Sequence, residues 1–65
     1  MNDDLIFSAL AYMGNASYQM AWANTCVEDI KEVPEELKNE MKQVNQTIHS
    51  LQERLREIRK QGGSL

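Results

Sequence analysis

The sequence has little of what usually holds so small a domain together. Cys26 is the only cysteine and His49 the only histidine, so an intramolecular disulfide is excluded and a structural zinc site is not expected. A chain of 65 residues buries only about 60% of its unfolded surface, which leaves a single core marginal. Association with a partner is the remaining way to stabilise the fold.

A long apolar run is also missing. The longest, residues 5–13, contains Ser8 and falls short of the roughly 20 residues that a transmembrane helix needs. Asp3 and Asp4 carry the wrong charge for a secretory leader, and a lone cysteine suits a reducing compartment. We therefore expect a cytoplasmic protein that does not enter membranes. Its net charge of −3 argues against general nucleic-acid binding.

Proline and glycine are scarce, and their positions indicate where helices begin and end. Pro34 is the only proline, and the glutamates that follow it suit the positive end of a helix dipole. Gly62 and Gly63 form a helix-terminating pair. The sequence predicts a single all-α domain over residues 1–65, with a helix over about residues 3–31, a turn at 32–34, a second helix over about 34–61 and a flexible tail at 62–65.

The second predicted helix has one apolar stripe. Its apolar residues follow a heptad pattern, with Met41, Ile48 and Leu55 at position a and with Leu37, Val44, Leu51 and Ile58 at position d. Most other positions are polar. We expect this stripe to pack against a single surface.

The first predicted helix is apolar on nearly all sides. One stripe contains regularly spaced alanines, which allow close approach, so we expect it to dock on the second helix; it comprises Ile6, Ala9, Met13, Ala16, Met20, Ala23, Val27 and Ile30. A second stripe is predicted to bind another copy or a larger protein, and it comprises Phe7, Ala11, Gly14, Tyr18, Ala21 and Trp22. A helix that is apolar all round is expected to be buried all round.

A short link forces the two helices to run antiparallel. Two such hairpins could then pair through the second stripe as a dimeric four-helix bundle, or assemble into a higher oligomer. A break of the first helix at Gly14-Asn15 is the alternative to a continuous helix. In length and helix plan the chain is similar to the ROP-type dimer of helical hairpins, a family that binds RNA through its helical faces. No residue motif is carried over from that family.

Basic side chains gather near the end of the second helix, at Arg54, Arg56, Arg59 and Lys60. They suit the negative end of the helix dipole, or they are candidate contacts for phosphate or an acidic partner. Acidic residues gather at the turn.

Cys26 and His49 have no neighbours at nucleophile or ligand spacing, so no catalytic residue, cofactor or metal site is predicted. We expect Cys26 to be a small apolar side chain beside the stripe of the first helix that docks on the second, and we expect His49 to be exposed. The composition favours a non-enzymatic, self-associating interaction module that serves as an adaptor or inhibitor of a larger, unidentified protein, and it suits an accessory protein of a phage or mobile element. The alternative is a nucleic-acid or nucleotide binder that uses the basic end.

Overall fold

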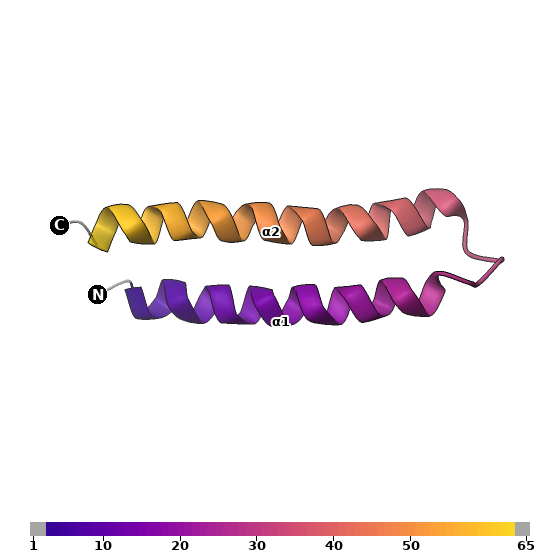
Figure 1. Ribbon diagram of the computed structural model, residues 1–65, viewed down its shortest axis with the longest axis horizontal. Coiled ribbons are helices and arrows are strands. Elements are labelled where there is room, and N and C mark those ends of the chain that lie inside the picture. Colours follow the sequence, from indigo (N-terminus) through magenta and orange to yellow (C-terminus); the bar gives the residue numbers. More distant parts are fainter. Residues whose placement is uncertain (1–2, 64–65) are drawn as a thin grey trace.

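The computed structural model describes residues 3–63, and the surroundings of side chains over residues 4–61. Helix α1 spans Asp3–Val27 and helix α2 spans Glu35–Gly63. The two lie side by side and antiparallel, so the first turn of α1 and the last turn of α2 share one end of the molecule (Figure 1). The chain measures 52 × 16 × 10 Å along its principal axes. The predicted all-helical hairpin is confirmed.

Helix α1 is continuous through Gly14 and Asn15, so the alternative with a break at this point is wrong. Among the described residues no glycine has a positive φ. The helix ends at Val27, four residues earlier than the sequence predicted. Its last turn contains no basic residue, and the carboxylates of Glu28 and Asp29 would oppose the negative end of the helix dipole.

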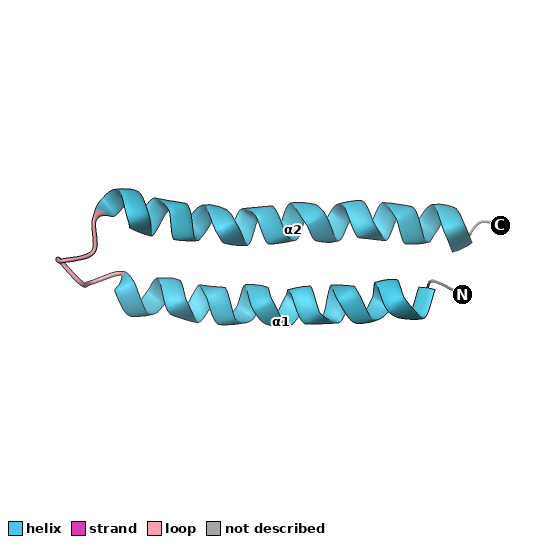
Figure 2. Cartoon of the chain, turned by 180° about the vertical axis from the view of Figure 1, so that it is seen from behind, coloured by secondary structure: helices cyan, strands magenta, loops and turns pink. Residues whose placement is uncertain are grey.

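The link between the helices covers residues 28–34 (Figure 2) and is longer than the predicted turn at 32–34. The chain leaves α1 through successive tight turns, each closed by a backbone hydrogen bond between residues three apart. The amide of Glu28 donates to the Thr25 carbonyl (3.3 Å), that of Ile30 to Val27 (3.2 Å) and that of Val33 to Ile30 (3.2 Å). Such tight turns satisfy carbonyls that the end of α1 leaves open.

Helix α2 begins one residue later than predicted. The carbonyl of Pro34 accepts the first helical hydrogen bond, from the amide of Lys38 at 3.1 Å, so the proline stands at the helix start without breaking the ladder. Glu35 and Glu36 lie in the first turn, where the dipole favours them. The helix extends to Gly63, past the predicted end at residue 61. The predicted flexible tail at 62–65 lies partly outside the described residues.

The hairpin is one layer of two helices, and no apolar side chain in its described part is buried. The buried side chains are polar, namely Ser17, 8% exposed, and Gln52, 6% exposed. The apolar residues that face the other helix are only half-buried, and they include Ile6, Leu10, Met13, Met20 and Val27 of α1 and Met41, Ile48 and Leu55 of α2. The space between the helices is therefore a contact row rather than a closed core.

Candidate interaction surfaces

Polar groups occupy the centre of the contact between α1 and α2. The side-chain amide of Gln52 donates to the carbonyl of Leu10 at 3.3 Å, and Ser17 Oγ lies 3.2 Å from His49 Nε2. The Oδ1 atoms of Asn24 and Asn45 are buried without a hydrogen-bond partner among the described residues. Buried polar groups are normally paired, so the unpaired oxygens of Asn24 and Asn45 lower the stability of the hairpin, while the two hydrogen bonds raise it.

These polar groups lie at the contact because α2 is rotated about its own axis, away from the orientation that the heptad predicts. The expected seam of heptad positions a and d faces α1 only through the a row, while positions e supply Lys38, Asn45 and Gln52 to the contact region. The d row is exposed: Leu37 at 45%, Val44 at 47%, Leu51 at 40% and Ile58 at 55%. The prediction that one surface would cover the whole stripe was wrong, because α1 covers only half of it.

Two contacts show which sides of the helices share a face of the hairpin. A Cβ added to Gly14, on the Phe7 side of α1, would lie 3.7 Å from Gln52 Nε2. His49, hydrogen-bonded to Ser17, also lies on the side of α2 away from the d row. The Phe7 side of α1 therefore adjoins the polar side of α2.

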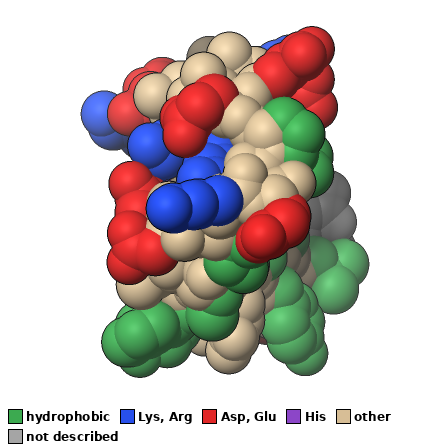
Figure 3. All heavy atoms as spheres, turned by 90° about the vertical axis from the view of Figure 1, so that its right-hand side faces the viewer, with side chains coloured by type: hydrophobic (Ala, Val, Ile, Leu, Met, Phe, Trp, Pro, Cys, Tyr) green, Lys and Arg blue, Asp and Glu red, His purple; other side chains and the backbone are tan. Residues whose placement is uncertain are grey.

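The opposite face combines exposed and half-buried apolar residues from both helices. Helical periodicity places the alanines of α1 on the side that adjoins the d row of α2. We call this the seam face, and it consists of Ala9, Ala16, Ala23, Leu37, Val44, Leu51 and Ile58. In the end-on view of Figure 3, hydrophobic side chains surround α1 and continue up one side of α2, whereas charged side chains cover the other side.

The second stripe of the sequence analysis is also exposed, and we call it the aromatic face; it consists of Phe7, Ala11, Gly14, Tyr18, Ala21 and Trp22. Phe7 is 59% exposed, Tyr18 62% and Trp22 54%. The rings of Tyr18 and Trp22 meet edge to face, with centroids 6.4 Å apart and planes at 77°. The Arg59 guanidinium lies 5.5 Å from the centroid of Phe7. These contacts hold large side chains in place without covering them.

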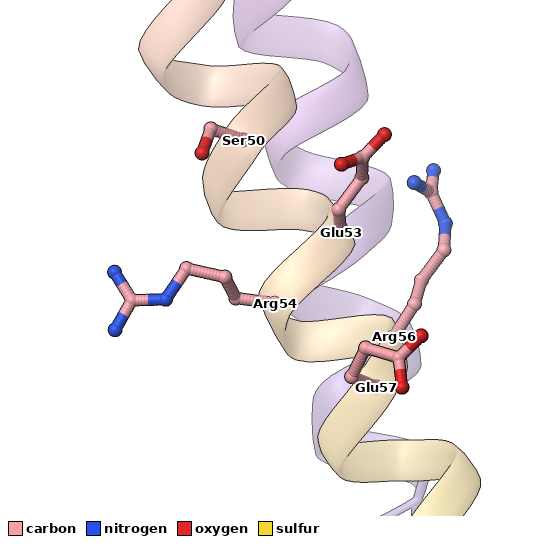
Figure 4. A pocket seen from close by; sticks show the side chains of 5 residues that line it. All are labelled: Ser50, Glu53, Arg54, Arg56 and Glu57. Atoms are coloured by element: carbon pink, nitrogen blue, oxygen red, sulfur yellow. The ribbon is translucent and has the colours of Figure 1, made fainter.

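The predicted basic cluster is dispersed around α2. Arg59 is drawn toward Phe7, while Arg54 and Arg56 extend on opposite sides of the helix (Figure 4). A hollow here is lined by Ser50, Glu53, Arg54, Arg56 and Glu57, all from α2. The carboxylates of Glu53 and Glu57 stand among the guanidinium groups, which makes this end mixed in charge. Over the described side chains, residues 4–61, this end of α2 has no concentrated phosphate site of the kind that nucleic-acid binding favours.

One basic side chain stabilises the acidic turn. Lys38 Nζ donates to the carbonyl of Glu28 at 3.0 Å and lies 3.5 Å from Glu35 Oε1. Its side chain is only 11% exposed, whereas that of Glu35 is 82% exposed. Lys38 thus brings to the end of α1 the positive charge that α1 itself lacks.

The remaining candidate residues differ partly from expectation. Cys26 is exposed and unpaired, so the interpretation of this thiol as a filler beside the seam was wrong. His49 is exposed, as expected, but its link to Ser17 was not predicted. Within residues 3–63, no three His, Cys, Asp or Glu side chains are grouped closely enough to hold a metal ion. Neither described helix combines the length and apolar character needed to cross a bilayer.

Comparison with known proteins gives no relative on which to base a function: no protein-family model, curated protein or solved structure matches this chain.

Proposed function

We propose that this chain is a non-enzymatic, self-associating interaction module that acts as an adaptor or inhibitor of a larger protein. One observation carries the proposal. The described part of the chain buries no apolar side chain, yet it leaves ten large apolar side chains exposed. Burial of apolar surface is the dominant favourable term in folding and in association. A partner that covers these side chains would supply what the hairpin lacks.

The exposed area supports the same proposal. The chain exposes 5354 Å², whereas a compact monomer of 7.5 kDa would expose about 4,250 Å². The difference, about 1,100 Å², exceeds the roughly 800 Å² that each partner contributes to a standard protein–protein interface. One partner of ordinary size would bring the exposed area down to the usual range.

The two apolar faces differ in composition, which favours two kinds of partner. The seam face is aliphatic and spans both helices. The aromatic face carries Phe7, Tyr18 and Trp22 on α1 alone. Aromatic side chains that fill a pocket dominate the binding energy of many interfaces. We assign the aromatic face to the larger protein and place the module in the cytoplasm, where the exposed thiol of Cys26 would stay reduced.

Light scattering after gel filtration tests the self-association. The expected result is a mass of at least two chains at micromolar concentration, with a circular dichroism spectrum that shows the helix content of the folded hairpin. A folded monomer throughout this range contradicts the proposal.

The larger partner is tested by retention on the immobilised chain. Trp22→Ala should release a stoichiometric partner while leaving the self-associated mass unchanged. Gln19→Ala, on the polar back of α1, is the matched control and should retain it. Equal retention by both variants would contradict the role of the aromatic face.

A further inference from the structure

We infer that a second copy of this chain docks on the seam face in antiparallel orientation, about a two-fold axis that passes between Ala16 and Ala16 of the second copy. The inference rests on the self-association proposed above and specifies its geometry. The spacing of residues along both helices supports this geometry. On α1 the alanines are evenly placed at 9, 16 and 23, so reversal of the direction maps Ala9 onto Ala23 and Ala16 onto itself.

The d row of α2 has the same property. Its members stand at 37, 44, 51 and 58, so an antiparallel copy places Leu37 against Ile58 and Val44 against Leu51. In a two-fold symmetric interface each residue contact occurs twice. Both apolar rows of the seam face are therefore self-complementary in this orientation.

The alanine row of α1 and the d row of α2 also have their centres at the same level along the hairpin. A single two-fold axis can relate both rows only if their centres are level. The α1 row is centred on Ala16 and the α2 row between residues 47 and 48. The Ser17–His49 contact places Ala16 level with residue 50 of α2, and the Gln52–Leu10 contact places it level with residue 46. The centre of the d row lies between these limits. A single two-fold axis can therefore pass through the middle of both rows.

Charge favours the antiparallel orientation over the parallel one. The turn end carries five acidic residues and two lysines, whereas the other end is balanced; the turn end has Glu28, Asp29, Glu32, Glu35 and Glu36 with Lys31 and Lys38, and the other end has Arg54, Arg56, Arg59 and Lys60 with Asp3, Asp4, Glu53 and Glu57. Parallel docking sets the two acidic turn ends together, whereas antiparallel docking sets each beside the balanced end of the other copy. Like charges placed together across an interface cost free energy, which disfavours the parallel orientation.

One interprotomer ion pair follows from the heptad. Glu40 and Arg54 both occupy position g, which borders the d row, and their midpoint, residue 47, lies half a residue from the centre of that row. In the antiparallel dimer Glu40 of one copy therefore faces Arg54 of the other, and the pair occurs twice. Arg54 already extends on the side of α2 opposite to Glu53 and Arg56 (Figure 4).

The size of the side chains fits this arrangement. Alanine at 9, 16 and 23 lets α1 approach α1 of the second copy closely, since interaxial distance depends on the side chains at the contact. The aliphatic d rows meet beside this contact. Phe7, Tyr18 and Trp22 lie on the other side of α1, so the dimer keeps both aromatic faces open for a larger protein.

Disulfide trapping tests the geometry in the full chain with Cys26→Ser as background. Ala16→Cys places two thiols next to the axis, and the Cα–Cα distance of a disulfide, about 4.4–6.8 Å, demands close approach. We expect rapid, nearly complete oxidation to a covalent dimer at low micromolar concentration. Ala11→Cys, at an alanine of the aromatic face that is exposed like Ala16, is the matched control and should oxidise at least tenfold more slowly.

The outcomes separate this inference from the proposed function. Faster trapping through Ala11→Cys would overturn the assigned face but leave self-association standing. A dimeric chain that neither variant traps would also overturn the geometry. A monomeric mass measured by light scattering would contradict both the proposed self-association and this inference.

Charge reversal supplies a second readout. Glu40→Lys and Arg54→Glu should each weaken the dimer about tenfold, because each introduces two like-charge contacts at the rim. The double variant should restore the Kd to within about twofold. Glu57→Lys, on the outer side of α2, should leave it unchanged. Additive losses in the double variant would contradict the antiparallel pairing of Glu40 with Arg54.

Discussion

Ser17 and His49 join the two helices through a hydrogen bond of 3.2 Å between Oγ and Nε2. The hydroxyl of Ser17 belongs to a buried residue, while the imidazole of His49 is open to water on its outer side. The pair fixes how α2 is rotated against α1, because His49 can reach Ser17 only if the d row turns away from the contact.

His49→Ala should lower the free energy of unfolding by about 1 kcal/mol, because it leaves the buried hydroxyl of Ser17 without its partner. Ser17→Ala should cost less, since it removes the polar group from the interface. Urea unfolding of both variants and of the double variant, at one chain concentration, gives the coupling energy. A coupling of zero would mean that the contact does not stabilise the hairpin.

Gly14→Ala should raise the free energy of unfolding by about 0.5–1 kcal/mol, because alanine is the better helix former. The new Cβ would meet Gln52 Nε2 at 3.7 Å, an ordinary contact distance. Thermal and urea unfolding measure the change, with Ala11→Gly as the control of opposite sign. Destabilisation by Gly14→Ala would show that Gln52 cannot accommodate the methyl group.

Asn45→Leu should stabilise the chain by about 1–2 kcal/mol, because it replaces a buried amide oxygen that has no hydrogen-bond partner in the described chain. Asn39→Leu, at an exposed position of the same helix, should change the stability by less than about 0.5 kcal/mol. Both are compared by urea unfolding. A loss of stability in Asn45→Leu would mean that the amide contributes a favourable contact.

Lys38→Met should cost about 1 kcal/mol, because it keeps the apolar stem but removes the ammonium group that binds the Glu28 carbonyl. Lys42→Met, at an exposed lysine one turn further along α2, is the control and should be nearly neutral. Urea unfolding at low and high salt measures both. Equal effects of the two substitutions would rule out a special role of Lys38 at the end of α1.

The sequence predicted the hairpin because Pro34 and the heptad of α2 are local signals, and local signals determine where helices form. It did not predict the rotation of α2. A heptad shows that positions a and d are apolar, but not whether the same partner covers both. Since α1 is apolar all round, its sequence does not select a docking side either.

A signal for the rotation was present in the polar residues. Lys38, Asn45 and Gln52 recur every seven residues on α2, and Ser17 and Asn24 stand seven residues apart on α1. Both sets lie at the contact between the helices, where Gln52 donates to the Leu10 carbonyl and Ser17 contacts His49. The residues of the aromatic face are exposed along α1, and their role as an interface is a proposal.

The hairpin is only one helix thick, and this has a consequence for backbone dynamics. Every amide of a lone hairpin is within a side chain's reach of water, so its exchange with deuterium is limited by the fraying of a single helix turn rather than by opening of a deep interior. An amide of α1 that keeps its proton for hours therefore indicates that a second protein layer covers that part of the helix.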